Sequence, residues 1–231
     1  MANAITENQF LARLPQDSIE RISPGFEWVE LPSGGVSELD TLDFVFFPVR
    51  GLVSFVLTSN NGTTSEVALA GDESLVGLCI FLNCKQPLIP AVVQRNVVAV
   101  RMPARTALEE FRRGLQFQYN VLSYMRVFFK QVAQTSLCNA QHSLEQRFCR
   151  WLLMSQDRLN ENEHVAMSQE LIAGMLGVRR EAVTRVATQL KSRRLIDYTT
   201  RRIEIVDRVG LMAASCECYE TLRSEFEALV V

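Results

Sequence analysis

The segment from Ser168 to Leu190 constrains the fold of this chain more than any other. It contains two helical runs separated by a glycine, Gly177. Ser168 is suited to cap the first helix, and the acidic Glu170 would lie favourably near the positive N-terminal end of that helix. Gly177 permits the left-handed backbone of a tight turn. The pattern therefore predicts a helix-turn-helix over these residues.

The second helical run has an apolar face and a polar one. Apolar residues at spacings of three and four predict an inward face at Val183, Val186 and Leu190. The outward residues near its N-terminal end are Arg180, Glu181, Thr184 and Arg185. Arginine can donate two hydrogen bonds to guanine, and glutamate can accept one from cytosine, so we expect these four side chains to read bases.

Residues at helix starts and in the next hairpin are candidates for phosphate contacts. A short strand, a polar turn and the alternating strand at 203–206 follow the second helix and predict a wing. Its tip would lie near a phosphate or the minor groove. The predicted phosphate-contacting residues are Ser168, Gln169, Arg179, Arg201 and Arg202.

Charge is distributed unevenly along the chain. The net charge is −2, but residues 179–194 contain six basic side chains against the single acid Glu181. A local basic segment is the footprint of a DNA-contacting element. The alternative is a helical hairpin with a solvated charged face, but such faces normally mix the two signs.

The N-terminal half has the texture of a β domain. Turn-forming residues, including the hairpin signal Asn61-Gly62, separate short apolar or alternating runs. Many short strands at this spacing predict a sandwich or a small barrel. The expected strands cover residues 27–31, 44–47, 52–57, 65–69 and 92–102.

Beyond Pro103 the pattern becomes helical, with a heptad-like seam on a helix of about 25 residues. Residues spaced by seven and their intermediate neighbours form this seam: Leu115, Leu122, Met125, Phe129 and Val132. A helix of this length cannot bury its whole surface on one small β domain, so we expect a homodimer. The alternative is a helix packed lengthwise on its own β domain.

The six cysteines are scattered and form no CxxC pair, so we expect reduced thiols, no disulfide framework and no metal site. Cys216 and Cys218 flank one residue, a spacing that could bind a soft metal or oxidise. Only two histidines are present. One of them, His142, lies at a polar hinge and is expected to be a cap or surface residue rather than a ligand.

Enzyme, cofactor and membrane functions have little support in the sequence. The chain shows no nucleophile with a paired base, no phosphate-binding glycine loop and no carboxylate–histidine cluster, so we expect neither catalysis nor a cofactor. The first 16 residues lack the pattern of a signal peptide, and no run of about 18 apolar residues occurs. We therefore expect a cytoplasmic protein with no membrane partner.

The chain resembles the Crp/Fnr family of transcription regulators over nearly its full length. Residues 172–185, IAGMLGVRREAVTR, are similar to that family's L-A-x-x-L-G-x-S-R-E-x-V-x-R motif. Phe47-Pro48, Gly51–Ser54 and Gly71-Asp72-Glu73 resemble its sensor domain. The resemblance implies an α+β protein: a double-stranded β-helix (a cyclic-nucleotide-binding-like jelly roll) at 1–113, a dimerisation helix and hinge at 114–141, and a winged helix-turn-helix at 142–231.

The resemblance also implies partners. These are a second copy of the chain, double-stranded DNA with a pseudo-palindromic operator, and RNA polymerase if the protein is an activator. The competing interpretation is a ligand-sensing or protein-interaction module without specific DNA binding.

Departures from the family pattern bear on the effector. Leu78 and Val93 stand where cyclic-AMP-binding members carry glutamate and arginine, and a buried cyclic phosphate needs a cation. Arg95 lies nearby in the sequence and is the alternative cation. The first cysteine is Cys79, so the N-terminal cysteine cluster of oxygen-sensing members is missing. We therefore expect an unidentified, uncharged or apolar effector, or none. Arg179 replaces the family's serine, which alters that phosphate contact.

Overall fold

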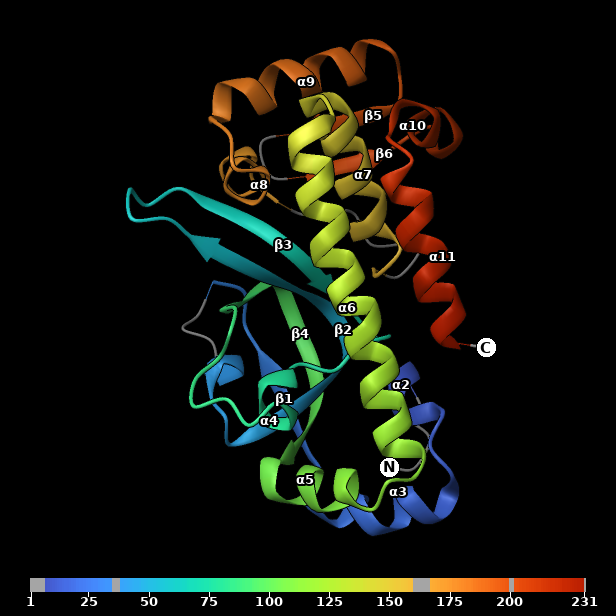
Figure 1. Cartoon of the computed structure of the whole chain (residues 1–231). Coiled ribbons are helices and arrows are strands. Elements are labelled where there is room, and N and C mark those ends of the chain that lie inside the picture. The colour runs from blue at the N-terminus through green and yellow to red at the C-terminus, as the bar shows by residue number, and fades with distance from the viewer. Residues whose placement is uncertain (1–6, 35–37, 160–166, 200–201, 231) are drawn as a thin grey trace. The chain divides into compact units, whose positions relative to one another are not determined.

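The computed structural model describes residues 7–34, 38–159, 167–199 and 202–230. Two compact units divide the chain: the first contains residues 1–55, 70–129 and 226–231, and the second contains residues 56–69 and 130–225. Figure 1 labels the helices and strands along the chain. An antiparallel sheet precedes a mostly helical C-terminal half, so the predicted α+β class is confirmed.

The N-terminal half alternates short helices with long strands. In chain order its elements are α2 (Gln9–Ala12), α3 (Gln16–Ile22), β1 (Glu27–Leu31), β2 (Phe44–Thr58), β3 (Thr64–Ala70), α4 (Leu78–Phe81), β4 (Ala91–Pro103) and α5 (Ala104–Arg112). Single 3-10 turns lie at Ser23–Gly25 and Glu38–Asp40. The strands form one sheet in the order β1-β4-β2-β3, in which β4 pairs antiparallel with both β1 and β2.

Strand β2 corrects one detail of the sequence prediction. The runs at 44–47 and 52–57 belong to one strand, whose register with β4 shifts on either side of Gly51. Gly51 has a φ of +94°, and a Cβ atom there would lie 2.2 Å from the carbonyl oxygen of Asn96. The bulge therefore requires glycine, and it interrupts the apolar run without ending the strand.

The turn between β2 and β3 agrees with its prediction. The amide of Ser59 donates to the carbonyl of Thr63 at 2.9 Å, and Gly62 has a φ of +83°. The side chain of Asn61 accepts a hydrogen bond from the Thr63 amide at 3.0 Å. The predicted Asn61-Gly62 turn is therefore confirmed.

Helix α6 (Gln116–Gln141) supplies one wall of the first unit's core. Phe117, Val121, Tyr124 and Val127 are buried there, and the Phe117 ring meets Phe10 edge-on at 5.6 Å between centroids. Burying an aromatic or large aliphatic side chain stabilises a fold by roughly 1.5–3 kcal/mol. One face of α6 thus packs within its own unit. This agrees with the alternative prediction, in which the helix packs on its own β domain rather than on a second copy of the chain.

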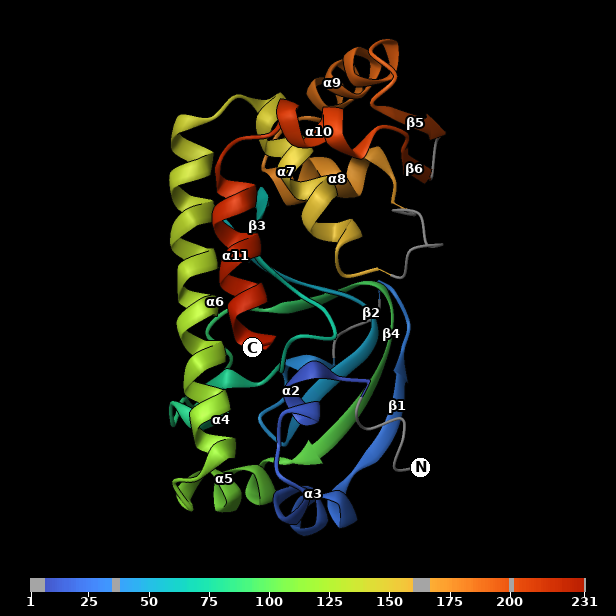
Figure 2. The ribbon, with the colours of Figure 1, turned by 90° about the vertical axis from the view of Figure 1, so that its right-hand side faces the viewer.

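The second unit is mostly helical. After α6 come α7 (Leu144–Gln156), α8 (Gln169–Leu176), α9 (Arg180–Ser192), β5 (Ile196–Thr199), β6 (Arg202–Ile205), α10 (Arg208–Ala214) and α11 (Cys218–Val230). Ser143 and Gln146 form a capping box at the start of α7. Helix α11 lies beside α6 (Figure 2), where the Gln134 amide donates to the Cys218 sulfur at 3.1 Å.

The core of the second unit surrounds Trp151. This side chain is buried on α7, and its ring N–H donates to the Glu66 carboxylate at 3.0 Å. The Glu66 carboxylate is itself buried, and this bond offsets part of the cost of removing the carboxylate from water.

Among the described residues, none of the helices combines the length and the apolar character that crossing a lipid bilayer would require.

Candidate nucleic-acid interface

Helix α8 begins and ends as the sequence predicts. The Ser168 hydroxyl accepts a hydrogen bond from the Leu171 amide at 3.2 Å, which satisfies one of the free donors at the helix start. Gly177 ends the helix in the left-handed conformation, with φ +66° and ψ +37°. The Val178 amide then donates to the Ala173 carbonyl at 3.0 Å. The cap and the turn are both confirmed.

Helix α9 presents its N-terminal end to solvent. Val183, Val186 and Leu190 are buried, so the predicted inward face is confirmed. Of the four predicted base-reading residues, Arg180, Glu181 and Arg185 are exposed, and Thr184 is half-buried. All four stand within the first two turns of the helix.

A hydrogen bond between the two helices holds two of the predicted contact residues together. The Thr184 hydroxyl donates to the Gln169 side-chain oxygen at 2.7 Å. Gln169 is the first residue of α8, and Arg179 immediately precedes α9. The structure therefore brings the predicted phosphate-contacting residues Ser168, Gln169 and Arg179 to the same end of the motif as the base-reading residues.

These residues border a hollow of about 530 Å³. The starts of α8 and α9 and the strand β5 line it, through Ser168, Gln169, Glu170, Arg180, Thr184, Tyr198 and Thr199. The Tyr198 hydroxyl lies 3.1 Å from the Thr188 hydroxyl, and the Lys191 ammonium lies over its ring at 5.2 Å from the centroid. Sequence reasoning missed Tyr198, although a tyrosine on the strand directly after the helix was a usable signal.

The basic residues of this segment differ in their partners. Lys191 pairs with Asp197 and Arg193 with Glu145, each at 2.5 Å. The Lys191 ammonium, with the Tyr198 amide, holds the pKa of Asp197 below its usual value. These pairs lie toward the C-terminal end of α9, where they neutralise the local charge.

At the N-terminal end of α9 the arginines form no ion pairs with described carboxylates. Within the part of the chain that the structure describes, no carboxylate forms an ion pair with Arg179, Arg180 or Arg185. All three side chains are exposed. Three of the four basic residues of this segment that form no ion pair in the described ranges thus lie at the N-terminal end of α9, where the helix dipole adds to their charge; the fourth is Arg194.

The predicted wing is present as a two-stranded sheet. Strands β5 and β6 pair antiparallel, with Ile196 opposite Ile205 and Thr199 opposite Arg202. Arg202 is exposed and lies 3.1 Å from the Glu204 carboxylate. Arg201 lies outside the described residues.

The predicted dimer residues lie on α6 or directly before it and fall into two groups. Leu115 precedes the helix and is 55% exposed; Leu122 is 50% exposed and Phe129 is 61% exposed. Met125 and Val132 are half-buried, and Met125 packs against the core of its own unit. The exposed apolar face also includes Tyr119 and Leu137, which the sequence analysis did not include.

Residues 146–214 match the family model of the Crp-like helix-turn-helix domain. The chain carries a Crp-like helix-turn-helix. This match runs from the first turn of α7 through α10 and includes both helices of the predicted helix-turn-helix and the wing.

Solved structures extend the similarity of this chain beyond that domain. FixK2 from Bradyrhizobium japonicum superposes with a TM-score of 0.70 at 16% identity, over 83% of this chain and 98% of its own. A protein of Eubacterium rectale assigned to the Crp/Fnr family of transcriptional regulators gives 0.69 at 16% identity, over 95% and 99%.

A third structure is CLP of Xanthomonas campestris, described as a c-di-GMP responsive global regulator. It gives a TM-score of 0.66 at 14% identity, over 83% of this chain and 99% of its own. Together these structures show that the chain has the fold of the Crp/Fnr regulators, which confirms the resemblance seen in the sequence. A comparison with curated proteins finds no match to the chain.

Proposed function

We propose that this protein is a sequence-specific, DNA-binding transcription regulator of the Crp/Fnr type. The observation that supports it best is the set of exposed arginines without a carboxylate partner at the start of α9, on a Crp-like helix-turn-helix. An exposed cation that is not neutralised by its own chain is available to a phosphate or a guanine. The mixed-sign surface of a solvated hairpin lacks this feature.

The residues divide into those that would read bases and those that would hold the backbone. Arg180 and Arg185 would donate paired hydrogen bonds to guanine, and Glu181 would accept from cytosine. Thr184, held by Gln169, would fix the spacing between the two helices. The Ser168 hydroxyl accepts from Leu171, so its own hydrogen remains available for a phosphate oxygen.

The exposed apolar face of α6 supports a homodimer. Leu115, Leu122 and Phe129 recur every seven residues and are half or more exposed in the single chain. Pairing two such faces would remove them from water. A two-fold dimer would place its reading helices about 34 Å apart, so the operator would be pseudo-palindromic. If the output is activation, RNA polymerase is the expected further partner.

The sheet domain would respond to an effector other than a cyclic nucleotide. Val93 is buried in β4, and Leu78 begins α4. Neither can supply the charged contacts that a buried cyclic phosphate and its ribose require, so Arg95 of β4 would have to provide the cation instead. An uncharged or apolar effector, or none, fits these two positions.

Selection from a random DNA pool tests the proposal directly. Purified protein would be incubated with the pool at two salt concentrations, and the retained DNA sequenced. We expect a two-fold-symmetric motif whose binding weakens at the higher salt, and its loss in the double variant Arg180→Ala, Arg185→Ala. Arg193→Ala, at the far end of α9, is the matched control. Absent or salt-insensitive binding would favour an interaction module instead.

A second experiment tests the dimer. Leu122→Glu places a charge in the middle of the exposed apolar face and should shift the protein to monomer in light scattering after gel filtration. Lys130→Glu, also exposed on α6, changes the charge without removing an apolar contact and serves as control. A dimer that survives Leu122→Glu would place the interface elsewhere.

A further inference from the structure

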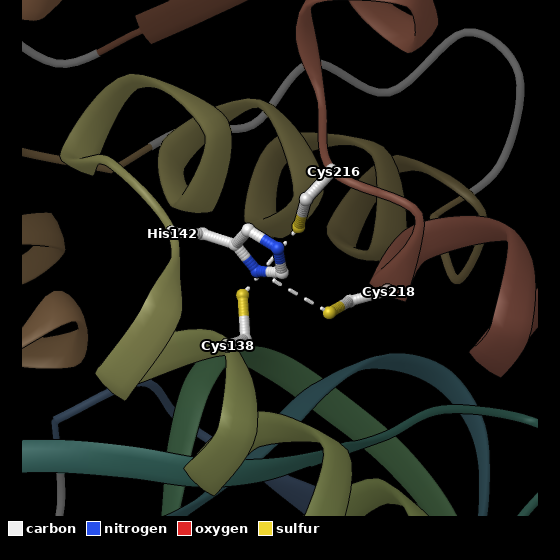
Figure 3. Close-up of side chains that lie close together, drawn as sticks. All are labelled: Cys138, His142, Cys216 and Cys218. Atoms are coloured by element: carbon white, nitrogen blue, oxygen red, sulfur yellow. Dashed lines mark hydrogen bonds between the residues drawn. The ribbon is translucent and has the colours of Figure 1, made fainter.

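Three cysteines and a histidine lie close together in the second unit, and none of them is a predicted DNA-contacting residue. Figure 3 shows their side chains pointing toward one another from two segments of the chain. Their ligand atoms all lie within 4.8 Å of one another. The four residues, named here the Cys3His cluster, are Cys138, His142, Cys216 and Cys218.

Two of the distances within the cluster lie close to the edges of a tetrahedral metal site. The sulfurs of Cys138 and Cys216 lie 3.5 Å apart, and the Cys218 sulfur lies 3.5 Å from Nδ1 of His142. Zinc bonds of about 2.3 Å to sulfur and 2.0–2.1 Å to nitrogen give tetrahedral edges of about 3.8 Å and about 3.5 Å. A disulfide would instead bring two sulfurs to about 2.05 Å.

Local structure explains why each ligand faces the cluster. Cys138 lies in the last turn of α6, and His142 directly follows the helix. The His142 amide donates to the Cys138 carbonyl at 3.1 Å, which keeps the two residues one turn apart. Cys216 follows α10, and Cys218 is the first residue of α11. The residue between them, Glu217, is exposed and reaches the outer side of the histidine ring.

That contact orients His142 as a ligand. Its Nε2 lies 3.1 Å from a Glu217 carboxylate oxygen, where a neutral imidazole can donate its N–H. The Nδ1 lone pair is then directed to the sulfurs. A carboxylate behind the ring of a histidine is the usual second shell of a zinc-bound imidazole.

Two polar side chains, Gln134 and Arg150, act on the sulfurs of the cluster. The Gln134 amide donates to the Cys218 sulfur at 3.1 Å. The positive charge of Arg150 acts on the Cys138 sulfur. Arg150 is buried, and in the described ranges no carboxylate forms an ion pair with it. Three thiolates, one imidazole and a divalent ion carry one negative charge, which this guanidinium would balance.

The plainer explanation is that buried cysteines pack here as small apolar side chains. Packing accounts for the burial of the three cysteines. It does not account for an imidazole nitrogen aimed at their sulfurs, with a carboxylate behind the ring and an amide donor on a second sulfur.

We propose that the Cys3His cluster is a structural site for one Zn²⁺ ion. All four coordination positions are filled by side chains, which is the closed arrangement of structural rather than catalytic zinc. Binding would release the remaining thiol protons to solvent and involve no change of oxidation state. The ion would tie the end of α6 to the start of α11. This reverses the expectation from sequence that the chain holds no metal site.

Metal content tests the proposal without reference to DNA. Full-length protein purified under reducing conditions should contain about one zinc ion per chain, as measured by inductively coupled plasma mass spectrometry. After the metal is stripped, Co²⁺ should bind with the same stoichiometry. It should produce a thiolate-to-cobalt charge-transfer band and the strong visible absorption of a tetrahedral ion.

Two variants assign the ligands. The double variant Cys138→Ser, Cys218→Ser should abolish Co²⁺ binding, whereas the single variant Cys149→Ser should retain it. Cys149 is the matched control because it is fully buried on α7, and burial raises its pKa to about 12. Reduced wild-type protein that binds neither Zn²⁺ nor Co²⁺ overturns the proposal. So does full binding in the double variant, or iron with sulfide in the purified protein. The wild-type result decides the matter even if a variant fails to fold.

Discussion

The second unit contains two groups of polar side chains: one faces solvent, and in the other the side chains face one another. The reading face at the starts of α8 and α9 exposes arginines that no described carboxylate neutralises. The Cys3His cluster is enclosed, and its ligand atoms face one another. One grouping is complementary to an anion outside the chain, and the other to a cation within it. We therefore expect the first to govern affinity for a partner and the second to govern stability.

The largest expected effect that tests this distinction is the rise in Tm when Zn²⁺ binds. At free Zn²⁺ a thousandfold above its Kd, binding to the folded state alone stabilises by about 4 kcal/mol, which raises Tm by about 8–16 °C for a chain of this size. Differential scanning calorimetry of metal-stripped protein, with and without Zn²⁺, measures the shift. The variant Cys138→Ser, Cys218→Ser should show none. An equal shift in that variant would assign the stabilisation to another site.

Substitutions of the reading arginines should change DNA affinity and leave Tm nearly unaltered. Arg180→Ala should cost about 1–3 kcal/mol on the selected operator and relax its base preference. Arg179→Ala should weaken binding to all sequences alike and lower the salt slope by about 1. Fluorescence anisotropy titrations at several salt concentrations separate the two. If both variants behave alike, the division into base and phosphate contacts is wrong.

A carboxylate in each grouping allows a sharper comparison. Glu217→Ala removes the partner of His142 and should weaken metal binding by about 10–100-fold without changing the DNA that is selected. Glu181→Ala should change the DNA sequence that is selected and leave the affinity for Zn²⁺ unaltered. Competition for Zn²⁺ with a coloured chelator gives the metal affinity. Glu220→Ala, exposed in the first turn of α11, is the control and should resemble wild type in both assays.

The smallest effect concerns the turn that supports the reading face. Gly177→Ala forces a side chain into a left-handed conformation and should cost about 1–2 kcal/mol of stability. Asparagine tolerates this backbone better, so Gly177→Asn should lose less. Urea unfolding of the metal-loaded protein measures both. An alanine variant as stable as wild type would mean that the turn relaxes without strain.

The two groupings also differ in how far the sequence could predict them. The reading face depends on residues within one short segment, so caps, apolar spacing and a glycine predicted its helices closely. The Cys3His cluster joins segments 78 residues apart. Its spacing resembles no common zinc motif, and His142 has no neighbouring histidine. Only the packing of α11 against α6 brings its halves together.

Elements outside the second unit show the same limit. The bulge at Gly51 made one long strand resemble two, because periodicity detects where alternation stops and not whether hydrogen bonding continues. The seam on α6 was predicted from spacing, but spacing did not reveal that Met125 packs into the core of its own unit. Local pattern predicts elements well, whereas partners distant in the chain depend on tertiary packing.

The hydrogen bond between Trp151 and Glu66 gives the protein a built-in optical reporter. The chain has two tryptophans: Trp151 is buried in the second unit, whereas Trp28 belongs to the first and is 42% exposed. A soluble quencher such as iodide should reduce the emission of Trp28 and leave that of Trp151 largely intact. A red shift of the protected emission would then follow the opening of the second unit alone, without any added label.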